Sequence, residues 1–154
     1  MGGTDRGLAA ADWPVVLTRH PFHLAVPVDD LDAARRFYGG VLGCEEGRSA
    51  DRWLDVDFFG HQLSLHVHED AGAVGTNGVD GDDVPVRHFG VVLPWADWHA
   101  LHTRLAAGGL TFRIAPRVRF QGEVGEQGTF FVEDPAGNAL EFKSFKDPAR
   151  LFAR

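Results

Sequence analysis

An internal repeat constrains the fold of this chain more than any other feature of its sequence. Each half reads as a strand, a helix and further strands, in that order. The stretch HLAV, which begins at His23, aligns with HFGV, which begins at His88, and each histidine stands a few residues before a predicted helix. The stretch GHQLSL (60–65) likewise aligns with GNALEF (137–142). A pseudo-twofold axis between two such units would let equivalent residues converge on it.

The predicted elements follow from the spacing of apolar residues. In the first half, a helix over 29–43 has Asp29 or Asp30 as a candidate cap and Gly43 as a candidate stop. The second helix, over 95–109, ends in a Gly-Gly pair. The turn at Gly60 separates two runs of β-forming residues. The predicted strands are 18–28, 52–60 and 61–68 in the first half and 86–94, 110–118 and 128–134 in the second, where 135–145 forms a turn followed by a final strand.

The length of 154 residues suits one compact domain of the α+β class. We expect a flexible leader over 1–16 and a single domain over 17–150. That domain divides into module one (17–70), a linker rich in Gly, Asp and Asn (71–84) and module two (85–150). A composition of 44% hydrophobic and 24% charged residues supports a buried core.

Composition also excludes several classes of function. The formal net charge of −7 argues against a nucleic-acid partner, which needs a basic face. No apolar run approaches the roughly 18 residues of a membrane span, and the first residues lack the pattern of a secretory signal. Cys44 is the only cysteine, so no internal disulfide forms, which fits a reducing compartment. We therefore expect a cytoplasmic protein that binds neither membranes nor nucleic acids.

Three side chains stand out against this background. His23 and His88 occupy the same point of two equivalent strands, and Glu141 lies on the last strand of the second half. An unpaired carboxylate inside an apolar strand is costly to bury, which favours a partner for Glu141. The counterpart of Glu141 in the first half is Ser64, which is a poor metal ligand.

Three segments resemble the vicinal oxygen chelate superfamily, which includes glyoxalase I, bleomycin-resistance proteins and extradiol dioxygenases. They are FHLAVPVDDLDAARRFYGGVLGC, RHFGVVLP and FFVEDPAGNALEFKSF, and the resemblance covers about residues 18–147. It implies two βαβββ modules whose sheets curve into an open barrel around a metal. It also implies that His23, His88 and Glu141 are the metal ligands. Members of the superfamily often dimerise.

This ligand set suggests the chemistry. Two imidazoles and one carboxylate leave coordination positions open, as in non-haem Fe(II) oxygenases, so substrate and O₂ can bind one ion. Glyoxalase-type members usually supply a fourth ligand at the position of Ser64, and its absence favours Fe(II), with Zn, Ni or Mn as alternatives. We therefore expect an Fe(II)-dependent dioxygenase acting with O₂ on a small oxygen-chelating substrate such as an aromatic diol.

His61 is the candidate acid–base residue, because extradiol dioxygenases carry a histidine at the matching place of this strand. Strict alternation would put it on the face opposite Ser64. These dioxygenases also carry a tyrosine where this chain has Phe131, so the substrate need not be a catechol. Polar residues that could line the pocket are Lys143, Gln62, His66 and Glu126, and residues that could bind a carboxylate are Arg52, Arg117 and Arg119.

Other interpretations stay open. A metal-dependent lyase or isomerase of the glyoxalase type would use the ion as a Lewis acid. A drug-binding resistance protein would bind without turnover, although the intact ligand set argues against it. His66 and His68 form a rival candidate for a metal cluster, but we interpret them as the polar end of a strand. We likewise interpret His99 and His102 as part of an exposed helix surface. A homodimer is expected only from the resemblance.

Overall fold

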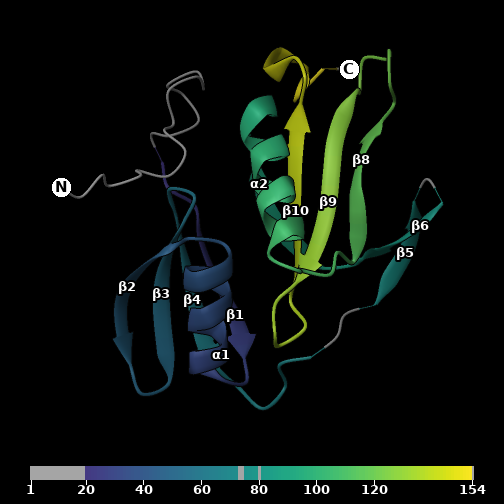
Figure 1. The fold of residues 1–154 in the computed structure, drawn as a ribbon. Helices are drawn as coiled ribbons and strands as arrows, with labels where there is room; N and C mark the ends of the chain where they lie inside the picture. Colours follow the sequence, from purple (N-terminus) through teal and green to yellow (C-terminus); the bar gives the residue numbers. More distant parts are fainter. Residues whose placement is uncertain (1–19, 73–74, 80, 154) are drawn as a thin grey trace.

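The computed structural model describes residues 20–72, 75–79 and 81–153, and the predicted leader lies outside them. Two four-stranded sheets have the orders β1-β4-β3-β2 and β7-β10-β9-β8, and a two-stranded hairpin, β5-β6, lies between them in the chain (Figure 1). The strands of the first sheet are β1 (His23–Val28), β2 (Glu45–Ala50), β3 (Trp53–Phe58) and β4 (His61–Val67). The hairpin strands are β5 (Thr76–Val79) and β6 (Asp82–Pro85). The strands of the second sheet are β7 (His88–Val92), β8 (Ile114–Arg119), β9 (Gln127–Glu133) and β10 (Ala139–Phe145).

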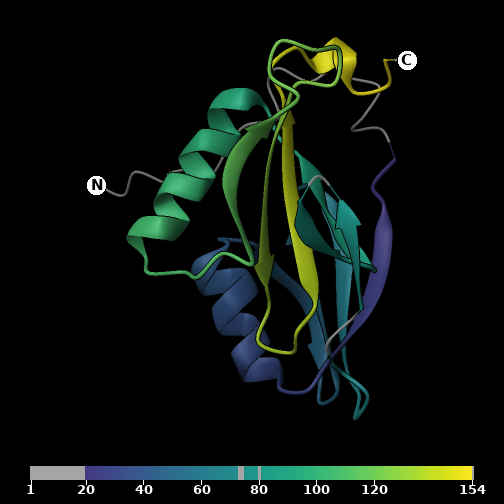
Figure 2. The same cartoon turned by 90° about the vertical axis from the view of Figure 1, so that its right-hand side faces the viewer.

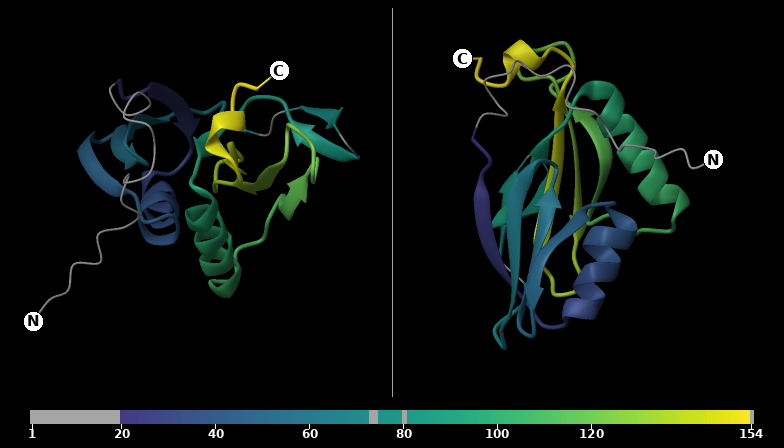
Figure 3. Two further views of the ribbon diagram at one scale, coloured as in Figure 1. Left: turned by 90° about the horizontal axis from the view of Figure 1, so that it is seen from above. Right: turned by 90° about the vertical axis from the view of Figure 1, so that its left-hand side faces the viewer.

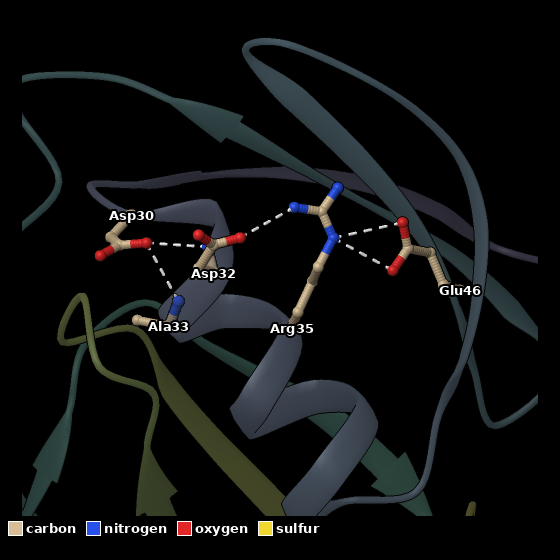
Figure 4. A network of polar contacts seen from close by, with 5 residues as sticks. All are labelled: Asp30, Asp32, Ala33, Arg35 and Glu46. Carbon is tan, nitrogen blue, oxygen red and sulfur yellow. Dashed lines mark hydrogen bonds and ion pairs between the residues drawn. The ribbon is translucent and has the colours of Figure 1, made fainter.

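The helices begin and end where local chemistry predicts. Asp30 caps α1 (Leu31–Arg35) by accepting hydrogen bonds from the N–H groups of Asp32 and Ala33, at 2.8 and 3.0 Å (Figure 4). The helix continues as a wider π-type turn over Arg36–Val41 and stops at Gly43, whose φ of +82° is in the left-handed region. In module two, α2 (Trp95–Ala107) ends at the predicted Gly-Gly pair.

Arg35 ties the first helix to the edge strand of its sheet. Its side chain donates to Asp32, one turn earlier, at 3.3 Å and to Glu46 of β2 at 3.1 Å (Figure 4). These groups are largely exposed, so the pairs contribute little to stability. They do give β2 a contact with the helix, although every residue of β2 is exposed.

The strand registers confirm the alignment of the two halves. In the parallel pair β1–β4, Ala25 lies opposite Ser64. In the parallel pair β7–β10, Gly90 lies opposite Glu141. Ser64 and Glu141 therefore occupy equivalent places, as the sequence predicts, and the structure confirms an α+β fold of two modules with curved sheets. The sheets do not close into a barrel.

One apolar core joins the modules. The ring of Phe58 lies 5.6 Å from that of Phe89, and Phe59 lies 5.6 Å from Phe142, each pair crossing from one module to the other. Both helices lie on the same side of the two sheets (Figure 2 and the right-hand view of Figure 3). Trp98 of α2 packs against Phe130 of β9, so Thr129 and Glu141 lie on the face of the second sheet that points away from this helix. None of the described helices is long and apolar enough to cross a membrane.

The segment DPAGN, the most specific part of the resemblance, forms a hydrogen-bonded turn that contacts module one. The buried Asp134 carboxylate accepts hydrogen bonds from the N–H groups of Ala136 and Asn138 and from the hydroxyl of Tyr38, at 2.8 to 3.0 Å. The side-chain amide of Asn138 donates to the carbonyl of Pro27 in β1 at 2.8 Å. The motif thus shapes the turn before β10 and ties it to module one.

Candidate metal centre

His88 and Glu141 form a pair on the second sheet. Nε2 of His88 lies 3.1 Å from Oε2 of Glu141, and the side chains are 34% and 13% exposed. The pairing follows from the parallel register, in which β7 begins beside the start of β10. The ring of Phe131, on the adjacent strand β9, lies 5.1 Å from the imidazole of His88 in an edge-on contact. The pair is therefore shielded from water by an aromatic wall on one side.

Neighbouring groups orient both members of the pair. Nδ1 of His88 lies 2.7 Å from the carbonyl oxygen of Pro85, and because a carbonyl only accepts, Nδ1 carries a proton. The hydroxyl of Thr129 donates to Oε1 of Glu141 at 2.6 Å. Contacts of this kind commonly hold metal-ligating imidazoles and carboxylates in place.

The electrostatics of the pair favour its charged form. The hydrogen bond with Glu141 raises the pKa of His88, against the opposing effect of partial burial. Burial tends to raise the pKa of Glu141, but the hydrogen bonds from His88 and Thr129 outweigh it and lower that pKa. Lys143, whose Nζ lies 3.9 Å from Oε1, favours the carboxylate in the same direction.

The spacing of the pair suits two adjacent ligands of one ion. Nitrogen and oxygen ligands lie about 2.1 Å from a first-row metal, so two of them at ordinary coordination angles are roughly 3.0–3.4 Å apart. The observed 3.1 Å separation of Nε2 and Oε2 falls in this range. With Nδ1 protonated, Nε2 is the nitrogen that can bind a metal once its own proton leaves.

His23, the third predicted ligand, is not part of this group. It is exposed at the start of β1, on the face of the first sheet that also carries Gln62. Within residues 20–72, 75–79 and 81–153, no three side chains of His, Cys, Asp or Glu lie close enough to hold a metal ion. The structure thus brings two of the three predicted ligands together within one chain, and the role of His23 stays a prediction.

Asp55 is a polar residue of this region that the sequence analysis missed. It lies opposite Ser64 in the β3–β4 register, and its side chain is only 9% exposed. Its carboxylate accepts hydrogen bonds from the hydroxyl of Ser64 at 2.5 Å and from the amide of Gln62 at 3.1 Å, and Arg48 lies 3.6 Å away. The available signal was the run WLDVDF, in which the acidic residues Asp55 and Asp57 alternate with apolar ones. A carboxylate therefore lies beside the serine that replaces the expected fourth ligand.

Arg117 and Arg119, two of the arginines considered for carboxylate binding, both lie on β8. Arg117 pairs with Thr129 in the register and Arg119 pairs with Gln127, so both follow the face that carries Glu141. Asp82, at the start of β6, forms ion pairs with both guanidinium groups. The predicted linker thus contains an ordered hairpin that reaches the second sheet.

Comparison with known proteins decides the family. A sequence model described as the Glyoxalase/Bleomycin resistance protein/Dioxygenase superfamily matches residues 20–142, most of the chain. The chain belongs to this superfamily. A comparison with curated proteins found no match.

Solved structures of the superfamily agree with this assignment. A glyoxalase/bleomycin resistance protein/dioxygenase from Alicyclobacillus acidocaldarius is 33% identical with a TM-score of 0.73, over 88% of this chain and 98% of the other. A lactoylglutathione lyase from Agrobacterium tumefaciens is 19% identical with a TM-score of 0.59, covering 88% and 98%. The fosfomycin resistance protein FosX from Listeria monocytogenes is 19% identical with a TM-score of 0.62, covering 84% and 95%. The last two show only that the superfamily fold is shared.

His61 lies away from the polar face of the first sheet in this superfamily member. Alternation along β4 puts it on the face opposite Gln62, and its Nδ1 accepts a hydrogen bond from the N–H of Phe22 at 2.8 Å. It lines a small, mainly apolar cavity with Phe22, Leu24 and Phe89, between the two modules. These contacts indicate a structural role, and its acid–base role stays a prediction.

The remaining candidates take ordinary structural places. Glu126 caps the loop before β9 by accepting from the N–H of Gly122 at 2.9 Å, and Arg52 donates to the carbonyl of Val67 at 3.1 Å. His66 lies on the polar face of β4, opposite Trp53. The other histidines of the sequence analysis contact polar neighbours: His68 pairs with Asp70, and His99 is hydrogen-bonded to His102.

Proposed function

We propose that the protein is a metal-dependent enzyme that acts on a small oxygen-chelating molecule, with His88 and Glu141 as metal ligands. The observation that carries this proposal is the 3.1 Å approach of Nε2 and Oε2, with each group oriented by a further hydrogen bond. Membership of the glyoxalase/bleomycin resistance protein/dioxygenase superfamily supports it.

The residues of the chain would divide the work as follows. His88 and Glu141 would hold the ion, while Pro85 and Thr129 keep their binding atoms in place. A bound divalent ion would polarise a chelating substrate oxygen or, if it is iron, bind O₂ beside the substrate. Phe131 would exclude water from one side of the pair and supplies no hydroxyl for proton transfer.

We propose that the third ligand, His23, comes from a second copy of the chain. His23 is exposed on β1, and the described part of the chain places it in no three-residue cluster. Two copies related by a twofold axis would present His23 of each to the pair of the other. The homodimer expected from the resemblance would then be required for activity.

The preferred metal is Fe(II) and the preferred reaction is dioxygenation. Ser64 is a weak ligand and donates its own hydroxyl to Asp55, so a site of His23, His88 and Glu141 keeps positions open for substrate and O₂. Zn, Ni or Mn would fit the same donors with different chemistry.

A specific observation favours a second candidate. The buried carboxylate of Asp55 lies beside Ser64, where glyoxalase-type members place a carboxylate ligand. If Asp55 supplied a fourth ligand, the ion would act as a Lewis acid in a lyase or isomerase reaction. Substitution Asp55→Asn separates the two, since it would weaken metal binding in this case and leave it nearly unchanged for a three-ligand site.

Metal binding by protein purified without oxygen tests the proposal. We expect one divalent ion per chain, lost in His88→Ala and retained in His99→Ala, a matched control on the exposed face of α2. Iron together with O₂ uptake in the presence of catechols would support dioxygenation, and zinc or nickel without O₂ uptake would support the lyase. Wild-type binding by His88→Ala would refute the site, and stoichiometric drug binding by a metal-free protein would favour the resistance protein.

Mixing two inactive variants tests the shared site. If each site combines His23 of one copy with His88 of the other, a mixed dimer of His23→Ala and His88→Ala contains one intact site. We expect the mixture to recover metal binding that neither variant has alone. If every site lay within one chain, the mixture would bind no more metal than the separate variants. A separate measurement, the pH profile of turnover in His61→Asn, tests the predicted proton transfer by His61.

A further inference from the structure

The polar face of the second sheet carries a cluster of cations beside the His88–Glu141 pair. Arg117 and Thr129 lie opposite each other in the register, and Thr129 lies opposite Lys143 on its other side. Residues directly opposite each other in antiparallel strands share a face. Because Thr129 also donates to Glu141, the cluster and the candidate metal ligands border one another.

Arg119, two residues after Arg117 on the same face of β8, is the third cation of this cluster and the most buried. Its side chain is only 9% exposed, and its Nε has no hydrogen-bond partner in the part of the chain that the structure describes. Among the same residues, the buried side-chain oxygen of the neighbouring Gln127 also has no partner. A guanidinium group stays charged in proteins, so its burial needs a compensating anion. The structure provides one in Asp82, whose carboxylate lies 2.6 Å from Nη2 of Arg119 and also pairs with Arg117.

Asp82 is held there by a small element. The hairpin β5–β6 has four residues in each strand, and within the described residues its strands pair only with each other. A two-stranded hairpin is marginally stable by itself. All of β5 is exposed, and Figure 1 shows the hairpin extending from the body of the molecule beside β8. Moving Asp82 away would therefore break no larger sheet.

We propose that Arg117 and Arg119 form a binding subsite for the carboxylate or phosphate group of a small anionic ligand, and that Asp82 occupies it until the ligand displaces it. The planar fork of an arginine matches the oxygens of both groups. The hairpin that carries Asp82 ends at Pro85, whose carbonyl orients His88. The subsite therefore lies where the anionic end of a substrate would sit while its chelating oxygens reach the metal. The placement beside the metal rests on the proposed function, but anion binding does not.

Anion binding by metal-free protein tests the subsite. The variants are Asp82→Asn and, as a matched control, Asp83→Asn, which changes the next residue of the same strand at an exposed position. The probes are inorganic phosphate and malonate, titrated calorimetrically after removal of metals with a chelator. Asp82 competes with the anion for the two arginines, so the apparent affinity of wild type for the anion falls with the fraction of the subsite that is free. We therefore expect Asp82→Asn to bind the anion at least about tenfold more tightly than wild type. Asp83→Asn should match wild type.

Two further measurements keep the result interpretable. Adding Arg119→Lys to Asp82→Asn keeps the charge but removes the fork, and should abolish the gain in affinity. If Asp82→Asn folds poorly, hydrogen exchange in the wild type replaces it, and malonate or phosphate should speed exchange in β5 and β6. The anion that acts more strongly identifies the group. No gain in Asp82→Asn, an equal gain in Asp83→Asn, or unchanged exchange would overturn the proposal. Because the protein is metal-free, a failed metal assay leaves this result intact.

Discussion

Replacing Thr129 with valine tests whether its hydroxyl holds Glu141 in place. Valine nearly matches threonine in shape, so the change removes the 2.6 Å hydrogen bond to Oε1 and leaves the packing of a residue that is 1% exposed. A hydrogen bond to a charged group contributes about 1.5–3 kcal/mol, and the 13% exposed carboxylate has little water to replace it. We expect a loss of about 2 kcal/mol, or roughly 4–8 °C in Tm for a chain of this size.

The same change should also weaken metal binding. Loss of a group that orients a ligand typically lowers metal affinity about 10–100-fold. Thr129→Ser is the control, because it keeps the hydroxyl and loses one buried methyl group, at a cost of about 0.8 kcal/mol in stability. Denaturant unfolding and metal titration of the three proteins measure both effects. The reasoning is refuted if the valine variant binds metal like wild type, or if the serine variant loses affinity to the same extent.

Three further predictions concern the surroundings of the site. Gly90→Ala should lose more than about 4 kcal/mol or fail to fold, because a Cβ there would lie 1.6 Å from the carbonyl oxygen of Glu141; a native Tm would contradict this. Tyr38→Phe removes the buried 2.9 Å hydrogen bond to Asp134 and should lower the free energy of unfolding by about 1.5–3 kcal/mol in urea, whereas an unchanged midpoint would show that the bond contributes nothing. In metal-free protein, the raised pKa of His88 adds stability that is lost as pH rises through it, and the lowered pKa of Glu141 adds stability that is lost as pH falls through it. The stability gap between wild type and Glu141→Gln should therefore be widest between the ordinary pKa values of 4.5 and 6.5 and narrow on either side, and a gap independent of pH would contradict this.

Local features of the fold were predictable because local chemistry determines them. Asp30 caps its helix by bonds to residues two and three positions away, and Gly43 ends the following turn in a conformation that glycine adopts easily. The apolar alternation of β4 likewise predicted its two faces. By contrast, β2 is exposed at every residue, so it carries no apolar period from which its bounds could be read.

The candidate site divides in the same way. The sequence by itself determined that Glu141 and Ser64 are equivalent and that His88 begins the strand beside Glu141, because a repeated pattern of alternation sets the same register in both modules. Only the tertiary structure decided that His23 stands apart from the pair, that Asp55 reaches Ser64 and that Asp82 covers two arginines. Those outcomes depend on how separate sheets and a hairpin pack, and such contacts between distant residues leave no periodic signal in the chain.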